Sequence, residues 1–165
     1  MRSRNLMSVV TLLLALVASL AVSTAAAPSA SSASYGSQVR SVDASFDSQV
    51  LYWTNVQRAK FGLRTLASGP CVDRFAENWT VKLAARDSFS HQGLRPILKR
   101  CHRRTAAENI ATASGALSAY DVVQAWMRSP GHRKNILNGR YKALGVSAWR
   151  SASTGRLYVT QDFAG

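Results

Sequence analysis

The stretch DVVQAWMRSPGHRKNIL, residues 121–137, decides how the rest of the chain is interpreted. Apolar residues within 122–127 recur at helical spacing and predict a buried helix. Residues 129–131, Ser-Pro-Gly, cannot continue a regular helix. His132 therefore lies where the predicted helix ends. A side chain at such a corner can face a cleft while the helix behind it fixes its position.

Two earlier segments show the same periodicity. Residues 46–60 and 72–85 each place apolar side chains on one helical face, and Gly62 is expected to end the first helix. Asn55 and Arg58 lie on a neighbouring stripe of that first helix. Because buried polar groups need partners, we expect both side chains to make internal hydrogen bonds.

The second half of the chain predicts strands as well as one further helix. Ser118 and Asp121 have the spacing of a capping box with Asp in place of Glu. Residues 105–113 are expected to be extended or a loop, while 143–149 and 157–163 have strand composition and should form a terminal hairpin. Helices followed by strands, without regular alternation or an internal repeat, indicate an α+β fold.

The N-terminal region is expected to lie outside the folded domain. Residues 1–27 have a basic start, an apolar core over 9–22 and the small residues of 25–27, which together predict a secretory signal peptide. A membrane anchor is the alternative, but an apolar core of about 14 residues is shorter than the roughly 20 that a spanning helix needs. Residues 28–45 are Ser/Ala-rich and predict a disordered linker. Residues 46–165 then form one domain.

The chain is strongly basic. Without Arg2 and Arg4, 19 basic residues face 8 acidic ones, a net charge of +11. In an exported protein this charge favours contact with an anionic cell-wall polymer or lipid surface. Nucleic acid is a weaker candidate, because we find no nucleic-acid-binding motif and export removes the chain from most nucleic acid. The charge is also compatible with a role in solubility alone.

Cys71 and Cys101 are the two cysteines of the chain. An exported protein meets an oxidising compartment, so we expect them to form a disulfide. A metal site is the poorer alternative, because no CxxC spacing is present.

Three polar residues are the candidates for a site: His91, Glu108 and His132. Each lies beside an aromatic or apolar residue and at a predicted helix end or loop. Two neutral imidazoles and a carboxylate are a plausible set of ligands for a zinc-like cation with an open coordination position. The same groups suit general acid/base chemistry, or a purely structural hydrogen-bonded cluster.

Six motifs in order resemble the bacterial branch of the CAP superfamily, also called SCP-like, which includes cysteine-rich secretory proteins, insect venom antigen 5 and plant pathogenesis-related class 1 proteins. The resemblance covers about residues 46–165. The motifs are NVQRAKFGLRTL (55–66), FSH (89–91), AENIA (107–111), VVQAWMRSPGHRKNIL (122–137), LGV (144–146) and YVTQDFAG (158–165).

This resemblance implies an exported three-layer α-β-α sandwich with a small antiparallel sheet and a central cleft. In eukaryotic members the cleft holds two His and two Glu that can bind a divalent metal. By motif, His91 takes the first histidine position and Glu108 the first glutamate position. The second glutamate falls at Ser129 and the second histidine at Tyr158, which become candidates to line the cleft. His132 belongs to the bacterial pattern and is expected to fill part of the space.

Two functions remain open at this level. The first is a secreted, monomeric binding module at or outside the cell envelope, whose cleft takes a small ligand, a lipid or a divalent cation such as zinc. The second is a protease-like hydrolase, metal-assisted or acid/base, that uses the same cleft. The sequence lacks the GxSxG and HExxH motifs, so we assign no catalytic residue and favour binding over catalysis.

Overall fold

The computed structural model describes residues 35–43 and 45–165, and the predicted signal peptide over 1–27 lies outside them. No helix in these two ranges is long and apolar enough to cross a membrane. The elements, in chain order, are β1 (Val39–Ser41), α2 (Phe46–Lys60), β2 (Ala67–Ser68), α3 (Pro70–Arg86), α4 (Arg95–Arg100), β3 (Ala106–Ala113), α5 (Ala119–Arg128), α6 (Pro130–Ile136), β4 (Ala143–Ser151) and β5 (Leu157–Ala164).

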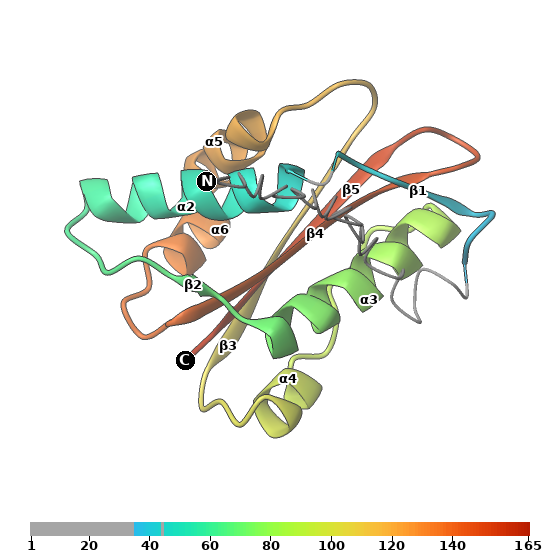
Figure 1. Ribbon diagram of the computed structural model, residues 1–165. Coiled ribbons are helices and arrows are strands. Elements are labelled where there is room, and N and C mark those ends of the chain that lie inside the picture. The colour runs from blue at the N-terminus through green and yellow to red at the C-terminus, as the bar shows by residue number, and fades with distance from the viewer. Residues whose placement is uncertain (1–34, 44) are drawn as a thin grey trace, which may run out of the picture.

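A single sheet forms the middle layer of the molecule. Its strand order is β1-β4-β5-β3, with antiparallel neighbours, and β2 adds a short parallel pairing to β4. Helices α2, α5 and α6 cover one face, and α3 with α4 covers the other (Figure 1). The predicted α+β, α-β-α sandwich is confirmed, and β3 is left as an edge strand, which positions the site described below.

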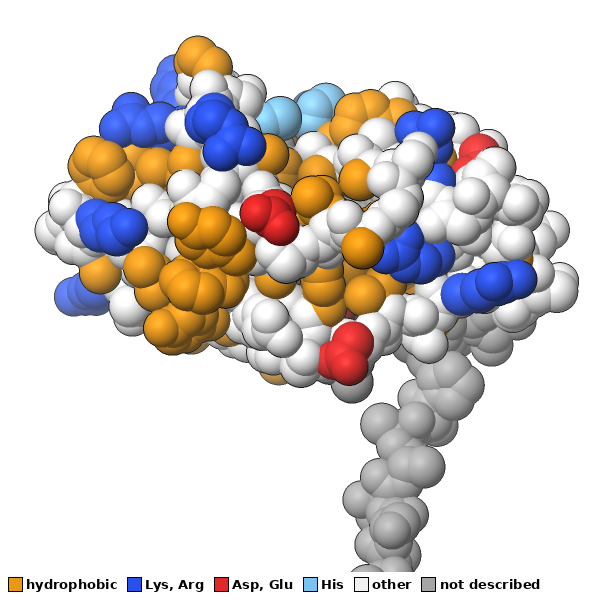
Figure 2. Space-filling view, turned by 90° about the horizontal axis from the view of Figure 1, so that it is seen from above, with side chains coloured by type: hydrophobic (Ala, Val, Ile, Leu, Met, Phe, Trp, Pro, Cys, Tyr) orange, Lys and Arg blue, Asp and Glu red, His pale blue; other side chains and the backbone are white. Residues whose placement is uncertain are grey.

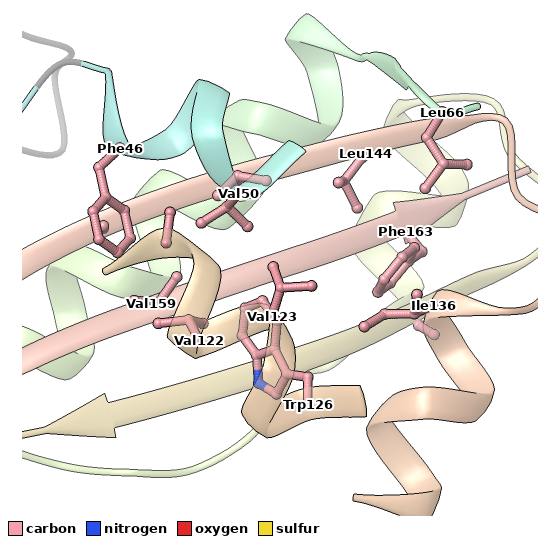
Figure 3. Close-up of a cluster of buried hydrophobic side chains, with 14 of the residues drawn as sticks. Phe46, Val50, Leu66, Val122, Val123, Trp126, Ile136, Leu144, Val159 and Phe163 are labelled. Atoms are coloured by element: carbon pink, nitrogen blue, oxygen red, sulfur yellow. The ribbon is translucent and has the colours of Figure 1, made fainter. Parts of the chain in front are cut away.

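The main core lies between the sheet and the layer of α2, α5 and α6 (Figure 3). Its centre is Trp126, which is 2% exposed and donates its indole N–H to the carbonyl oxygen of Ile110 at 3.1 Å. Val122 and Val123 from the same turn of α5 are fully buried. The predicted apolar stripe is confirmed, and the Ser118–Asp121 capping box forms as expected.

On the opposite face, α3 lies very close to the sheet because of Gly145 on β4. A Cβ at this position would lie 2.4 Å from the backbone carbon of Val72. Only glycine permits this approach of helix and strand. The predicted disulfide is confirmed: Cys71 in the first turn of α3 bonds Cys101 at the end of α4, which holds α4 against α3.

The polar groups expected to bond internally on α2 do so. Asn55 exchanges two hydrogen bonds with the backbone of Leu66. The buried Arg58 guanidinium donates to the carbonyl oxygens of Ile136 and Asn138, at 2.7 and 3.0 Å. Arg58 therefore ties α2 to the end of α6.

The prediction of a disordered linker over residues 28–45 is wrong for the last part of this range. Residues Val39–Ser41 form β1 and pair with β4 at residues 149–151. The Ser/Ala-rich composition concealed this strand, because strand pairing at a sheet edge uses backbone groups and here needs few apolar side chains. Val39 supplies one of them and is 6% exposed in the core cluster beside Val81.

Candidate functional site

The site lies at the β3 edge of the sheet, where two of the predicted residues meet. Glu108 belongs to β3, and His91 belongs to the loop between α3 and α4. His91 Nδ1 and Glu108 Oε1 are 2.6 Å apart. The imidazole is 60% exposed and the carboxylate only 2%. A buried carboxylate thus fixes the ring of an accessible histidine.

Gln92 joins this pair to a second carboxylate. Its backbone N–H donates to Glu108 Oε1 at 3.1 Å, and its side-chain Nε2 donates to Glu108 Oε2 and to Asp162 Oδ2, both at 2.9 Å. Glu108 and Asp162 are paired across β3 and β5. Because carboxylates accept and amide nitrogens donate, the amide nitrogen of Gln92 must face them and its Oε1 must point away.

Asp162 is the buried member of the carboxylate pair and is 0% exposed. Burial, and then the nearby charge of Glu108, raises the pKa of Asp162 well above its usual value. Its Oδ1 is buried without a hydrogen-bond partner among the described residues. Two like charges this close in a buried position are unfavourable, so the environment favours Asp162 in the protonated state.

His132 reaches the same edge from the other helical layer. The predicted helix end before His132 is confirmed, because α5 stops at Arg128, and His132 itself lies in the first turn of a new helix that Pro130 begins. The carbonyl oxygen of His132 accepts from Asn109 Nδ2 at 3.2 Å. Asn135, also on α6, donates to the carbonyl oxygen of Glu108 at 3.2 Å. These bonds hold the start of α6 against β3.

Side-chain alternation along β3 explains how both layers take part. Glu108 points toward the α3 layer, and the next residue, Asn109, points toward α6. His91 and His132 therefore approach the edge strand from its two sides. Burial, and then the nearby charge of His91, lowers the pKa of His132. The imidazole of His132 is thus favoured in its neutral form.

The three predicted residues do not form a three-ligand metal cluster. Within residues 35–43 and 45–165, no group of three or more His, Cys, Asp or Glu side chains is arranged to hold a metal ion. Glu108 is instead used to position His91. What the geometry supplies is a pair of imidazoles, one of them oriented by a carboxylate, as is common for histidines that ligate metals.

The two remaining candidates to line a cleft, Ser129 and Tyr158, lie in different surroundings. Ser129 is half-buried between α5 and α6, where it makes no side-chain capping bond. Tyr158 is 1% exposed and packs with Val81 on α3, and its hydroxyl donates to Asp87 Oδ1 at 3.2 Å. Tyr158 therefore does not line a cleft, because β5 is an interior strand and α3 covers it.

Sequence reasoning missed Gln92 and Asp162. Gln92 follows directly after His91, but an isolated glutamine in a loop carries no signal of its own. Asp162 lies in β5, all of whose residues are buried, four residues after Tyr158 and so on the same face. A carboxylate inside a buried strand was the available signal that a polar partner must lie opposite it.

Comparison with known proteins identifies the family of this chain. The sequence model of the cysteine-rich secretory protein family, CAP, matches residues 51–163. The chain belongs to the CAP family. The uncharacterized protein YkwD of Bacillus subtilis is 33% identical over 127 residues, which are 73% of this chain and 47% of that protein. The chain thus spans about half the length of this curated relative.

Solved structures agree with the CAP assignment. An extracellular protein of Bacillus anthracis that contains an SCP domain is 26% identical, with a TM-score of 0.60 over 78% of this chain and 40% of that one. An outer surface protein of Borrelia burgdorferi superimposes with a TM-score of 0.64 at 21% identity, over 76% of this chain and 96% of that one. The latter likeness establishes the fold alone.

Proposed function

We propose that this CAP domain is an exported, non-enzymatic binding module that acts at or outside the cell envelope. We further propose that the ring nitrogens of His91 and His132 bind a divalent cation such as zinc. The observation that carries the proposal is the 2.6 Å contact between His91 Nδ1 and Glu108 Oε1. This contact uses one ring nitrogen of His91 and leaves Nε2 as the nitrogen available for a ligand.

The surroundings of both imidazoles support metal binding. A metal binds the neutral imidazole, and burial favours that form for His132. Glu108 is held by the backbone and side chain of Gln92, so it can orient His91 without moving. With two protein ligands, the remaining coordination positions stay open to water or to a small anionic ligand. The four-residue set of eukaryotic relatives is not reproduced, so we expect modest affinity.

Export is supported by independent features. The sequence of residues 1–27 predicts a signal peptide, and the Cys71–Cys101 disulfide is typical of oxidising compartments. The Bacillus anthracis relative is described as extracellular. The net charge of +11 favours retention at an anionic surface once the protein is outside the cell.

A hydrolase remains the second candidate, and the His91–Glu108 pair is the observation that favours it. An imidazole oriented by a buried carboxylate can act as a general base. Against this, within the described residues no hydrogen bond joins the His91 ring to a hydroxyl or thiol, and both cysteines are in the disulfide. Hydrolysis of a peptide or ester panel that is abolished by His91→Ala would favour the catalytic candidate over the binding module.

Calorimetric titration with zinc tests the binding proposal. The chain has three histidines, so each can be replaced by alanine in the protein that lacks its predicted signal peptide. We expect His91→Ala and His132→Ala each to weaken zinc binding about tenfold or more, as loss of a ligand should. His102→Ala, on the turn after α4, should remain within about twofold of wild type. Equal binding by all four proteins would contradict the proposal.

A further inference from the structure

A groove lies between α3 and α4, beside the site, and shares Gln92 with it. Its volume is about 510 Å³, within the range of roughly 300 to 1,000 Å³ that is usual for small-ligand sites. Its lining combines ring-bearing, basic and amide side chains. These include Phe75, Trp79, Lys82, Gln92, Pro96 and Arg100.

Rings provide the apolar part of this groove. The Trp79 indole N–H donates to the carbonyl oxygen of Ser90 at 2.9 Å, which fixes the ring and satisfies its one polar group. Phe75 and Trp79 are both half-buried and lie one helical turn apart on α3. Pro96 lies opposite them on α4. Flat apolar surfaces that are held rigidly suit the apolar face of a sugar ring.

The charged residues that line the groove are all basic. Lys82 and Arg100 are exposed on its rim, and no carboxylate belongs to its lining. The Lys82 ammonium lies 5.9 Å from the centroid of the Trp79 ring, so the cation and the ring share one surface. A groove with walls of one sign concentrates ligands of the opposite sign.

This charge is a local feature and does not follow from the overall excess of basic residues. A second hollow, of about 450 Å³ between α2 and α3, has a lining that includes Asp43, Asp47, Asp73 and Glu77 and no basic residue. On the face seen in Figure 2, basic side chains are scattered among neutral and apolar ones. The α3–α4 groove therefore combines basic groups with an ordered ring, whereas the hollow between α2 and α3 is lined by acidic groups.

Gln92 supplies a hydrogen-bonding group at the side of the groove nearest the His91 site. Its Nε2 is committed to Glu108 and Asp162, so its Oε1 is the end left to accept a hydrogen bond. Among the described residues, no donor bonds this oxygen. A sugar hydroxyl is a suitable donor. The amide also separates the buried carboxylates from an anionic ligand in the groove.

We infer that the α3–α4 groove binds a segment of an acidic polysaccharide, a polymer of sugar rings that carry carboxylate or phosphate groups. The inference rests on the proposed role at an anionic surface outside the cell and names the part of the molecule that makes the contact. A lipid bilayer fits less well. The rings of Phe75 and Trp79 are recessed and half-buried, whereas insertion into a bilayer needs apolar side chains that protrude.

The test uses polygalacturonate as the acidic polysaccharide, dextran as a neutral one and phosphatidylglycerol vesicles as the lipid surface. Binding of the protein without its predicted signal peptide is measured at fixed ionic strength. Lys82→Glu/Arg100→Glu is compared with Lys60→Glu/Lys142→Glu, which makes the same change in net charge at exposed positions outside the groove. Trp79→Leu removes the ring while keeping an apolar side chain, and thermal melting verifies that each variant folds.

We expect the protein to bind polygalacturonate and not dextran. Lys82→Glu/Arg100→Glu should weaken this binding about tenfold or more, and Lys60→Glu/Lys142→Glu less than threefold. Trp79→Leu should weaken it at least threefold. Equal losses in the two charge-reversal pairs would overturn the groove while leaving the proposed surface role intact. Binding to vesicles but not to polygalacturonate would overturn the polysaccharide in favour of lipid. No binding to any anionic probe would overturn the groove and the proposed surface role together, without affecting the zinc titration.

Discussion

Asp47, on α2, is a partly buried carboxyl group with a strongly raised pKa. Burial raises its pKa from 3.8 to about 7, and the neighbouring charges of Asp73 and Glu77 add to the effect. A hydrogen bond from the backbone N–H of Ala148 acts in the opposite direction. The folded protein therefore holds a proton on Asp47 that the unfolded chain has already released at pH 5 to 6.

This difference in protonation between the folded and unfolded states determines how stability changes with pH. Between pH about 4 and 7 the folded state binds more protons than the unfolded state, so the contribution of Asp47 to stability falls as pH rises through that window. Asp47→Asn cannot ionise and its amide oxygen can still accept from Ala148. We expect urea unfolding to show the variant more stable than wild type at pH 8 by on the order of 1 to 3 kcal/mol, and nearly equal to it at pH 4. A difference that does not change with pH would contradict this.

Single residues also show what the sequence could and could not predict. His91 and Glu108 were identified because histidine and glutamate carry recognisable chemistry, and the structure brings them into contact. Asp162 was not identified, because its role depends on which residue lies opposite it on the neighbouring strand. Pairing between β3 and β5 joins residues about 50 positions apart, and the local sequence does not determine this register.

At the scale of elements, the packing of α3 on β4 depends on Gly145. A Cβ there would lie 2.4 Å from the backbone carbon and 2.5 Å from the backbone oxygen of Val72. Little room for a local shift exists, because Val72 is 1% exposed and the disulfide from Cys71 holds the first turn of α3. The contact is therefore tighter than any side chain allows.

Gly145→Ala should reduce the free energy of unfolding by about 3 kcal/mol, the upper part of the range for overpacking a buried site. Gly131→Ala is the matched control, since a Cβ there meets nothing within 4 Å and the position lies in the first turn of α6. The control should be neutral or more stable by up to about 1 kcal/mol. Urea denaturation measures both, and a small effect of Gly145→Ala would show that α3 can move away from the sheet.

The elements themselves were largely predictable. Periodic apolar residues located α2, α3 and α5, and turn residues located the β4–β5 hairpin. For β3 the sequence predicted either an extended segment or a loop, and it gave no prediction of β1. Both strands are defined by pairing partners that are distant in the sequence. Such long-range pairing leaves only a weak signal in the local residue pattern.

For the whole molecule, the sheet edge at β3 is the organising feature. The α3 layer presents His91 to it, and α6 presents His132 from the layer of α2 and α5. The family explains why the fold is an α-β-α sandwich, and the pairing of these two imidazoles has a local structural cause. That pairing arises because Pro130 begins a short helix packed against the edge strand.

The most direct test of this arrangement is a nitrogen-detected NMR titration of the three imidazole rings with zinc. We expect the ring signals of His91 and His132 to shift together, with one apparent dissociation constant, while those of His102 stay unchanged. The Nε2 signal of His91 should move more than its Nδ1 signal, because Glu108 occupies Nδ1. Shifts of His91 without His132, or equal shifts of all three rings, would contradict a shared site at the β3 edge.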